Sequence, residues 1–289
     1  MTAPQPPVSD SDSELVPVSE GQQQAGPTEL NLDWAGYLKA GEYRRALAAA
    51  RVGNADVAVQ AALEDLHDLQ EAVRARRLGL ASRLVARLGT HTEEMQTPAD
   101  FRRALDLSGL DAGVAALLAA DQERLTDEQT LTARLQPALH EGLTRAEALN
   151  TLGVLHALQD REGQARQAFG EAFTHDPGHY RALTNLGNMA LEGGDAASAE
   201  KLYKQATALN GDYAGAHHNL GVALRKLGRL NESVSAIKRG QRLSVRQTKR
   251  DQDDELKSSP GTQRTVQLLR LGMIILVVVL VLLAVRGRF

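Results

Sequence analysis

The sequence predicts an all-α protein in which helical hairpins stack into an α-solenoid and a single transmembrane helix follows near the C-terminal end. Three observations lead to this fold class. Ala and Leu, which are strong helix formers, are abundant, whereas the aromatic residues that strands favour make up only 3% of the chain. Residues 145–246 repeat with a period of 34 residues, and the segment Leu271–Val285 contains fifteen consecutive residues without a charge.

The composition and the motif content exclude several classes of function. The 33 basic and 36 acidic side chains give a net charge of −3, whereas proteins that bind mainly nucleic acid need a basic excess to neutralise phosphates. The absence of cysteine excludes disulfides and thiolate catalysis. There is no phosphate-binding glycine loop, no G-x-G-x-x-G and no H-E-x-x-H motif. We therefore expect no catalytic residue, cofactor or metal, and a protein that is not an enzyme.

Residues 1–29 are predicted to form a disordered acidic tail. Proline, serine and acidic residues dominate this segment, which has too little apolar area to offset the entropy lost on ordering. It has no basic residue near its start and no apolar core of sufficient length, so it is not a signal peptide.

Residues 30–143 contain helical patterns that we expect to stack on the repeats. Thr97 followed by Pro98 predicts a helix start, because proline is favoured in the first helical position. Residues Thr126 to Gln129 fit a capping box, which also marks a helix start. Between these helices, a loop is predicted near residues 89–97.

The three 34-residue blocks begin at Arg145, His179 and Tyr213, and each is predicted to form two helices joined by a turn. Thr144 and Glu147 fit a capping box at the start of the first block. Small residues recur at matching places, which lets the two helices of a block approach closely. Large residues then fill the space between them. The matched positions are Gly153, Gly187 and Gly221; Ala165, Ala199 and Ser233; and Phe169, Tyr203 and Ile237.

This pattern resembles the tetratricopeptide repeat (TPR), and we predict three tandem TPRs over residues 144–246. Gly41, Tyr43 and Ala46 sit at fitting offsets for an earlier repeat, so residues 30–143 are predicted to be a degenerate TPR-like region. Whether each helix pair in that region is a true repeat is left open by the sequence.

The resemblance implies a concave groove lined by the first helix of each repeat. Polar residues occupy the matching positions, and an amide can pair with both groups of a peptide bond. The resemblance therefore implies that an extended peptide of a partner protein binds there, although ordinary solvated polar residues would give the same pattern. Gly215 and Asn219 stand where some family members carry the basic residues that grip a terminal carboxylate, which argues against that clamp. The candidate groove residues are Asn150, Thr151, Thr184, Asn185, Asn188, His218 and Asn219.

The last repeat is rich in basic residues and lies closest in sequence to the predicted membrane span. Anionic headgroups attract such residues, so this block is predicted to lean on the membrane surface. The alternatives are a solvated basic face and a nucleic-acid contact, the latter disfavoured because interleaved aromatic residues are missing. The candidate membrane-surface residues are Arg225, Lys226, Arg229, Lys238, Arg239, Arg242 and Arg246.

The C-terminal part is predicted to be a flexible linker over residues 247–265 and a transmembrane tail anchor over residues 266–289. Twelve of the fifteen residues in Leu271–Val285 are Leu, Ile or Val. A helix of this length spans about 22 Å, or about 27 Å with Leu268 and Leu269. The alternative is a buried core helix, but the segment lacks the polar stripe expected of one next to solvent. Arg270 and Arg286 bracket the span as membrane anchors.

Together these features predict a membrane-tethered scaffold or adaptor that recruits or helps assemble partner proteins. Because four residues follow the span and no export signal precedes it, the soluble part is expected in the cytoplasm. The Ala-, Gly- and Arg-rich composition favours a bacterial inner membrane over an organelle outer membrane. The alternative function is an enzyme with an unrecognised catalytic site in residues 30–143, and buried acids with shifted pKa values would support it.

Overall fold

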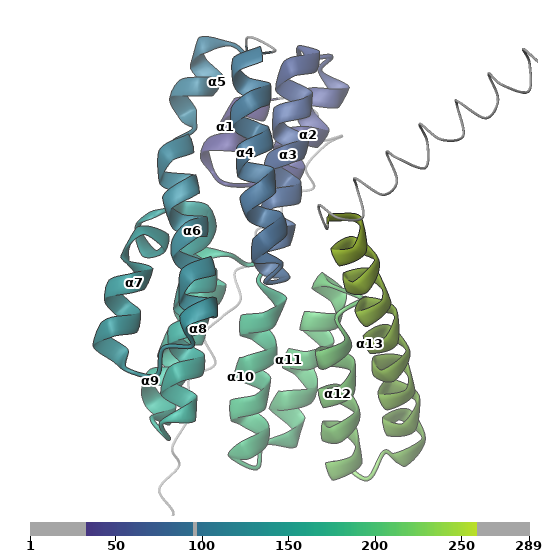
Figure 1. Cartoon of the computed structure of the whole chain (residues 1–289). Helices are drawn as coiled ribbons and strands as arrows, with labels where there is room; N and C mark the ends of the chain where they lie inside the picture. The colour runs from purple at the N-terminus through teal and green to yellow at the C-terminus, as the bar shows by residue number, and fades with distance from the viewer. Residues whose placement is uncertain (1–32, 95–96, 259–289) are drawn as a thin grey trace, which may run out of the picture.

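The computed structural model describes residues 33–94 and 97–258, and in this part of the chain it contains helices and no strand. The helices pack as antiparallel neighbours into a curved stack (Figure 1), which confirms the all-α solenoid. The predicted tail of residues 1–29 and the predicted anchor of residues 266–289 lie outside the described residues. The helices are α1 (Trp34–Lys39), α2 (Tyr43–Val52), α3 (Val57–Arg74), α4 (Leu78–Glu94), α5 (Ala99–Ala104), α6 (Leu107–Glu123), α7 (Glu128–His140), α8 (Gly142–Leu158), α9 (Glu162–His175), α10 (Tyr180–Glu192), α11 (Ala196–Leu209), α12 (Ala214–Lys226) and α13 (Leu230–Ser258).

Helices α1 to α7 occupy the predicted helical region and bury one continuous apolar core. Leucines on one face of α3, including Leu63, Leu66 and Leu69, are fully buried, because their spacing places them on the same side of the helix. Leu88 of α4 and Phe101 of α5 are buried in the same core. Leu152 of α8 packs against this core, which therefore continues into the first repeat.

The two predicted helix starts in this region differ from the observed ones by one residue each. Helix α4 continues to Glu94, so most of the predicted loop at 89–97 is helical, and Pro98 caps α5 instead of opening it. At α7 the cap is Asp127, whose carboxylate accepts hydrogen bonds from the backbone N and the hydroxyl of Thr130 at 2.8 and 2.7 Å. A carboxylate satisfies both donors of Thr130 at once, and each such cap stabilises a helix by about 1 kcal/mol.

The three predicted repeats correspond to the helix pairs α8–α9, α10–α11 and α12–α13. In each pair a glycine of the first helix faces a large residue of the second. A Cβ atom at Gly187 would lie 2.6 Å from Cε1 of Tyr203, and one at Gly153 would lie 2.6 Å from Cε1 of Phe169. The glycine is therefore required for close approach of the two helices, as the sequence pattern predicts.

The start of the first repeat corrects a prediction. Helix α8 begins at Gly142, where Glu141 is the cap, so Thr144 and Glu147 do not form a capping box. Thr144 is buried inside the first turn and its hydroxyl donates to the carbonyl of Ala138 at 2.9 Å. Thr144 lies inside α8 because the connection from α7 is tight: Glu141 is both the C-cap of α7 and the N-cap of α8. The carboxylate of Glu147 is thereby free for long-range contacts.

The end of the described chain corrects a second prediction. Residues 247–258, predicted to be part of a flexible linker, continue α13 as helix to Ser258. No glycine or proline occurs between Gly240 and Pro260, so nothing in the sequence stops the helix, even though the segment is polar. Residues 259–265 lie outside the described residues.

None of the described helices combines the length and the apolar character needed to cross a bilayer. Helix α13 is 29 residues long but polar. The predicted span Leu271–Val285 and its bracketing residues Arg270 and Arg286 are not among the described residues, so the transmembrane helix stays a prediction.

Candidate functional site

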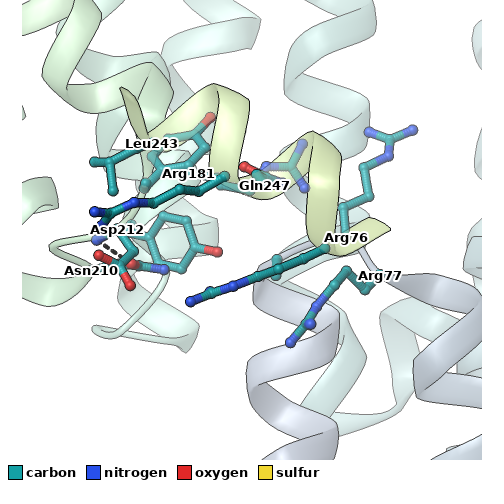
Figure 2. Close-up of a pocket in the computed structure, with 12 residues that line it drawn as sticks. Arg76, Arg77, Arg181, Asn210, Asp212, Leu243 and Gln247 are labelled. Atoms are coloured by element: carbon teal, nitrogen blue, oxygen red, sulfur yellow. Dashed lines mark hydrogen bonds between the residues drawn. The ribbon is translucent and has the colours of Figure 1, made fainter. Parts of the chain in front are cut away.

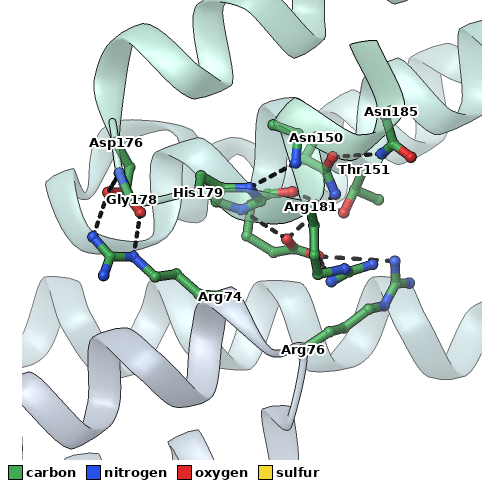
Figure 3. Close-up of polar contacts among 11 residues, drawn as sticks. Arg74, Arg76, Asn150, Thr151, Asp176, Gly178, His179, Arg181 and Asn185 are labelled. Atoms are coloured by element: carbon green, nitrogen blue, oxygen red, sulfur yellow. Dashed lines mark hydrogen bonds and ion pairs between the residues drawn. The ribbon is translucent and has the colours of Figure 1, made fainter. Parts of the chain in front are cut away.

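The candidate groove residues lie on the first helices of the three repeats, and their amides hydrogen-bond to one another. Nδ2 of Asn185 on α10 donates to Oδ1 of Asn150 on α8 at 2.8 Å (Figure 3). Nδ2 of Asn219 on α12 donates to Oδ1 of Asn188 on α10, also at 2.8 Å. Tyr203 donates its hydroxyl to the same Asn188 oxygen. These bonds, which we call the amide row, connect each first helix to the next.

The candidate residues differ in how accessible they are to a partner. Asn150 is fully buried and Thr184 is 3% exposed, with its hydroxyl donating to the carbonyl of Tyr180 at 2.8 Å. His218 is exposed, and Thr151, Asn185, Asn188 and Asn219 are half-buried. Within the described residues, Oδ1 of Asn185 and Nδ2 of Asn188 have no hydrogen-bond partner. Oδ1 of Asn219 likewise has no partner among the described residues, so two unpaired acceptors and one unpaired donor group remain in the row.

Behind the amide row lies a buried carboxylate, Glu147, which is 1% exposed. Oε1 accepts from Nη1 of Arg181 at 2.9 Å, and Nη1 of Arg76 lies 3.8 Å away (Figure 3). Oε2 lies 3.0 Å from Nε2 of His179 and accepts from Asn150 at 3.3 Å. The partners come from α8, the start of α10 and the α3–α4 turn, so this network joins the first two repeats to the N-terminal helices.

The backbone fixes the tautomer of His179. Nδ1 of its ring accepts a hydrogen bond from the backbone N–H of Ala182 at 3.1 Å, so the proton of the neutral ring is on Nε2. That N–H donates to Glu147. Burial raises the pKa of Glu147, but Arg181, His179 and Arg76 more than offset this effect and hold the pKa below its ordinary value. Glu147 is therefore an ionised structural group with basic partners, which is the arrangement that buried charges require.

A second ion pair also joins the N-terminal helices to the repeats. Arg74, at the end of α3, contacts both oxygens of Asp176 in the turn after α9: Nε–Oδ2 is 2.7 Å and Nη2–Oδ1 is 2.5 Å. The two side chains are 16% and 15% exposed, so water screens the pair only partly. The backbone N–H of Gly178 donates to the same carboxylate at 3.0 Å, and a Cβ at Gly178 would overlap the guanidinium. The bidentate pair therefore links the end of α3 to the turn after α9.

The candidate membrane-surface residues differ in their contacts. Arg229 is paired with Glu200 and Glu232 at 2.6 and 2.5 Å, and Arg246 lies in a pocket together with residues of the α3–α4 turn. Lys238 and Arg242 are exposed on one face of α13. Helical geometry places Arg246 about 25 Å along α13 from Arg229, with the other candidates of this helix between them, so the set extends along the repeat.

Among the described side chains of region 30–143, one acid is buried, Asp65 on α3. Its carboxylate contacts Arg87 and lies 2.8 Å from Nδ1 of His91, both on α4, so the pair holds α3 against α4. Within residues 33–94 and 97–258 there is no group of His, Asp and Glu side chains suited to a metal ion. Burial raises the pKa of one further acid of this region, Glu141, whose carboxylate caps α8 by accepting a hydrogen bond from the backbone N of Leu143.

Comparison with known sequences agrees with the repeats. The profile of the tetratricopeptide repeat family matches residues 163–209 and 184–244. No curated protein sequence matches the chain.

Among solved structures, the second TPR of Spaghetti (RPAP3) bound to an HSP90 peptide is similar to this chain. It is 23% identical, with a TM-score of 0.33, over 34% of this chain and 91% of that one. A crystal structure of MamA is 18% identical, with a TM-score of 0.35, over 67% of this chain and 98% of that one. A further structure of MamA protein is 15% identical, with a TM-score of 0.34, over 75% and 90%. The profile match and the interlocked glycine and aromatic residues support the assignment of residues 163–244 to the tetratricopeptide repeat family.

Proposed function

We propose that this protein is a membrane-tethered TPR scaffold that recruits or helps to assemble partner proteins, and that it binds an extended segment of a partner along the amide row. The observation that carries the proposal is the unpaired acceptor of Asn185 and the unpaired donor of Asn188, both on half-buried side chains of the same helix. A peptide backbone supplies the complementary N–H and C=O groups, and no catalysis is needed.

The bonds within the amide row favour such binding energetically. Asn185 and Asn188 are each held by an amide of a neighbouring repeat, so their side chains are ordered before a peptide arrives. Ordering a side chain at an interface costs about 0.5–1.5 kcal/mol, and the row avoids most of this cost. The proposed partner is therefore recognised mainly through its main chain.

The tether in this proposal is the segment Leu271–Val285, with Arg270 and Arg286 at the two interfaces. Each central Leu, Ile or Val favours insertion by about 0.3–0.6 kcal/mol. The scaffold would lie in the cytoplasm at a bacterial inner membrane. Lys238 and Arg242, exposed on α13, would face the anionic headgroups.

Partner recruitment is expected to depend on the amide row. Replacing Asn185→Ala together with Asn219→Ala removes the free acceptor of Asn185 and the amide that holds Asn188 in place. At about 0.5–1.5 kcal/mol for each hydrogen bond lost or weakened, capture of the partner should fall about tenfold. The measurement is crosslinking of the full chain in native membranes, followed by quantification of the crosslinked partners. The matched control is Gln205→Ala, an exposed amide on the second helix α11. Equal capture by the double variant and the control would contradict groove binding.

Membrane association is expected to depend on the apolar segment. Introducing Val278→Arg and Leu280→Arg costs about 2.5–3.5 kcal/mol per arginine at the centre of a span. The full chain should sediment with membranes and the double variant should shift to the supernatant. Thr262→Arg with Gln263→Arg adds the same charge outside the span and should leave sedimentation unchanged. A wild-type chain that stays in the supernatant without detergent would overturn the tether.

A further inference from the structure

A recessed pocket of about 490 Å³ lies between the α3–α4 turn and the last repeat (Figure 2). It is distinct from the amide row. Its walls carry five arginines and a single acid, Asp212. Two of the arginines come from the α3–α4 turn, one from α10 and two from α13. They are Arg76, Arg77, Arg181, Arg246 and Arg250.

Two of these arginines are already neutralised within the protein. Arg76 contacts Asp121 at 2.6 Å and lies 3.8 Å from Glu147, and Arg181 contacts Glu147 at 2.9 Å. Arg77, Arg246 and Arg250 are exposed, and none of them has an ion-pair partner in the part of the chain that the structure describes. The pocket therefore holds three uncompensated guanidinium groups against one carboxylate.

We propose that this pocket binds an acidic segment of a protein partner, with its carboxylates held by Arg77, Arg246 and Arg250. The inference rests on the proposed function, because it assumes that the scaffold recruits proteins, and it adds the chemical character of one partner. A guanidinium presents a planar fork of donors that matches a carboxylate in bidentate geometry. Three such guanidinium groups, one on the α3–α4 turn and two on α13, fit a ligand that carries several carboxylates.

The remaining wall of the pocket fits a peptide better than an inorganic ion. The rings of Tyr180 and Tyr213 lie 4.9 Å apart, and Leu243 is 7% exposed beside them. These groups offer an apolar surface for the hydrocarbon part of glutamate or aspartate side chains. The volume falls in the range of about 300–1,000 Å³ that is typical of pockets for organic ligands.

The same cations could attract lipid headgroups, but the geometry favours a peptide. The walls of the pocket come from the α3–α4 turn on one side and from α10–α13 on the other, so its arginines are spread around a recess and do not form a flat surface. The headgroup plane of a bilayer cannot enter such a recess unless a lipid leaves the membrane. A flexible acidic peptide enters without that cost.

The test uses the full chain in a non-ionic detergent and a fluorescein-labelled hexaglutamate peptide with capped ends, measured by fluorescence anisotropy at low ionic strength. Arg77→Gln, Arg246→Gln and Arg250→Gln together should weaken binding by about tenfold or more. The matched control removes three exposed cations that do not line the pocket, Arg44→Gln, Arg166→Gln and Lys201→Gln, and should weaken binding by no more than about threefold, because none of them contacts the peptide.

A second variant that should bind more tightly keeps the proposal testable if the triple variant misfolds. Asp212→Asn removes the only acid of the pocket and should tighten hexaglutamate binding by about two- to fivefold. Equal weakening by the two triple variants, or equal binding of hexaglutamine, would overturn the site. So would a pocket variant that loses binding to anionic vesicles but keeps binding to hexaglutamate. Such failures leave capture through Asn185 and Asn219 intact, so the proposed function can stand without the pocket.

Discussion

Glu147→Ala is expected to lower the free energy of unfolding by about 3–5 kcal/mol, because it removes the shared anion from Arg181, His179 and Arg76 and leaves buried cationic and polar groups without a partner. Arg181 is 17% exposed, so water can reach little of it. The measurement is denaturant unfolding of the full chain followed by circular dichroism. Glu171→Ala, which removes an exposed acid on α9, should stay within about 0.5 kcal/mol of the wild type.

The same carboxylate gives stability a defined dependence on pH. The pKa of Glu147 in the folded protein lies below its ordinary value of 4.5. Its contribution is therefore fully present above about pH 4.5 and is lost as the pH falls through the folded pKa. The stability difference between wild type and Glu147→Ala should shrink over this acidic window. A difference that is constant, or that grows with acid, would show that Glu147 does not act through its charge.

Tyr203→Ala is expected to cost about 3–5 kcal/mol, because a fully buried ring is replaced by a cavity between α10 and α11. The ring also donates its hydroxyl to Asn188, so the variant removes one support of the amide row. Thermal unfolding of the full chain measures the loss. Tyr203→Phe keeps the ring and should cost only about 1 kcal/mol for the missing hydrogen bond.

A double-mutant cycle makes the interlock between Gly187 and Tyr203 testable. In the wild type, Gly187→Ala should destabilise by about 1–3 kcal/mol, because its Cβ would lie 2.6 Å from the tyrosine ring. In the Tyr203→Ala background the clash is absent, and alanine is the better helix former by about 1 kcal/mol. The same substitution should then be neutral or stabilising. Additive effects of the two changes would contradict the contact.

The repeat architecture could be predicted from the sequence because each repeat contacts mainly its neighbours. A glycine such as Gly187 and the ring that covers it, Tyr203, lie 16 residues apart, and a periodic pattern shows both at once. The family profile and the structure confirm this part. The limits of helices were less predictable. Helix α13 continues through residues 247–258 because polarity alone does not stop a helix, whereas glycine or proline does.

The role of Glu147 was not predicted, because its spacing from Thr144 fits a local capping box. Its actual partners lie far along the chain: His179 is 32 residues later, Arg181 is 34 residues later, and Arg76 belongs to the N-terminal helices. One pattern in the sequence does indicate the pair of Glu147 with Arg181. Glu147 and Arg181 occupy the same position in successive 34-residue repeats, so opposite charges there predict a pair between adjacent first helices. No comparable periodicity points to Arg76.

The length of helix α13 affects how the two ends of the described solenoid are coupled. It is 29 residues long, whereas its partner α12 has 13, so its C-terminal half extends past the repeat and brings Arg246 and Arg250 into one cavity with Arg76 and Arg77. Residues of the α3–α4 turn and of the end of α13 thus line the same cavity, although they lie far apart along the chain. A molecule that contacts both walls binds best at one separation of the walls, and that separation depends on how strongly the solenoid is curved. Binding in the cavity and the curvature of the solenoid are therefore thermodynamically coupled.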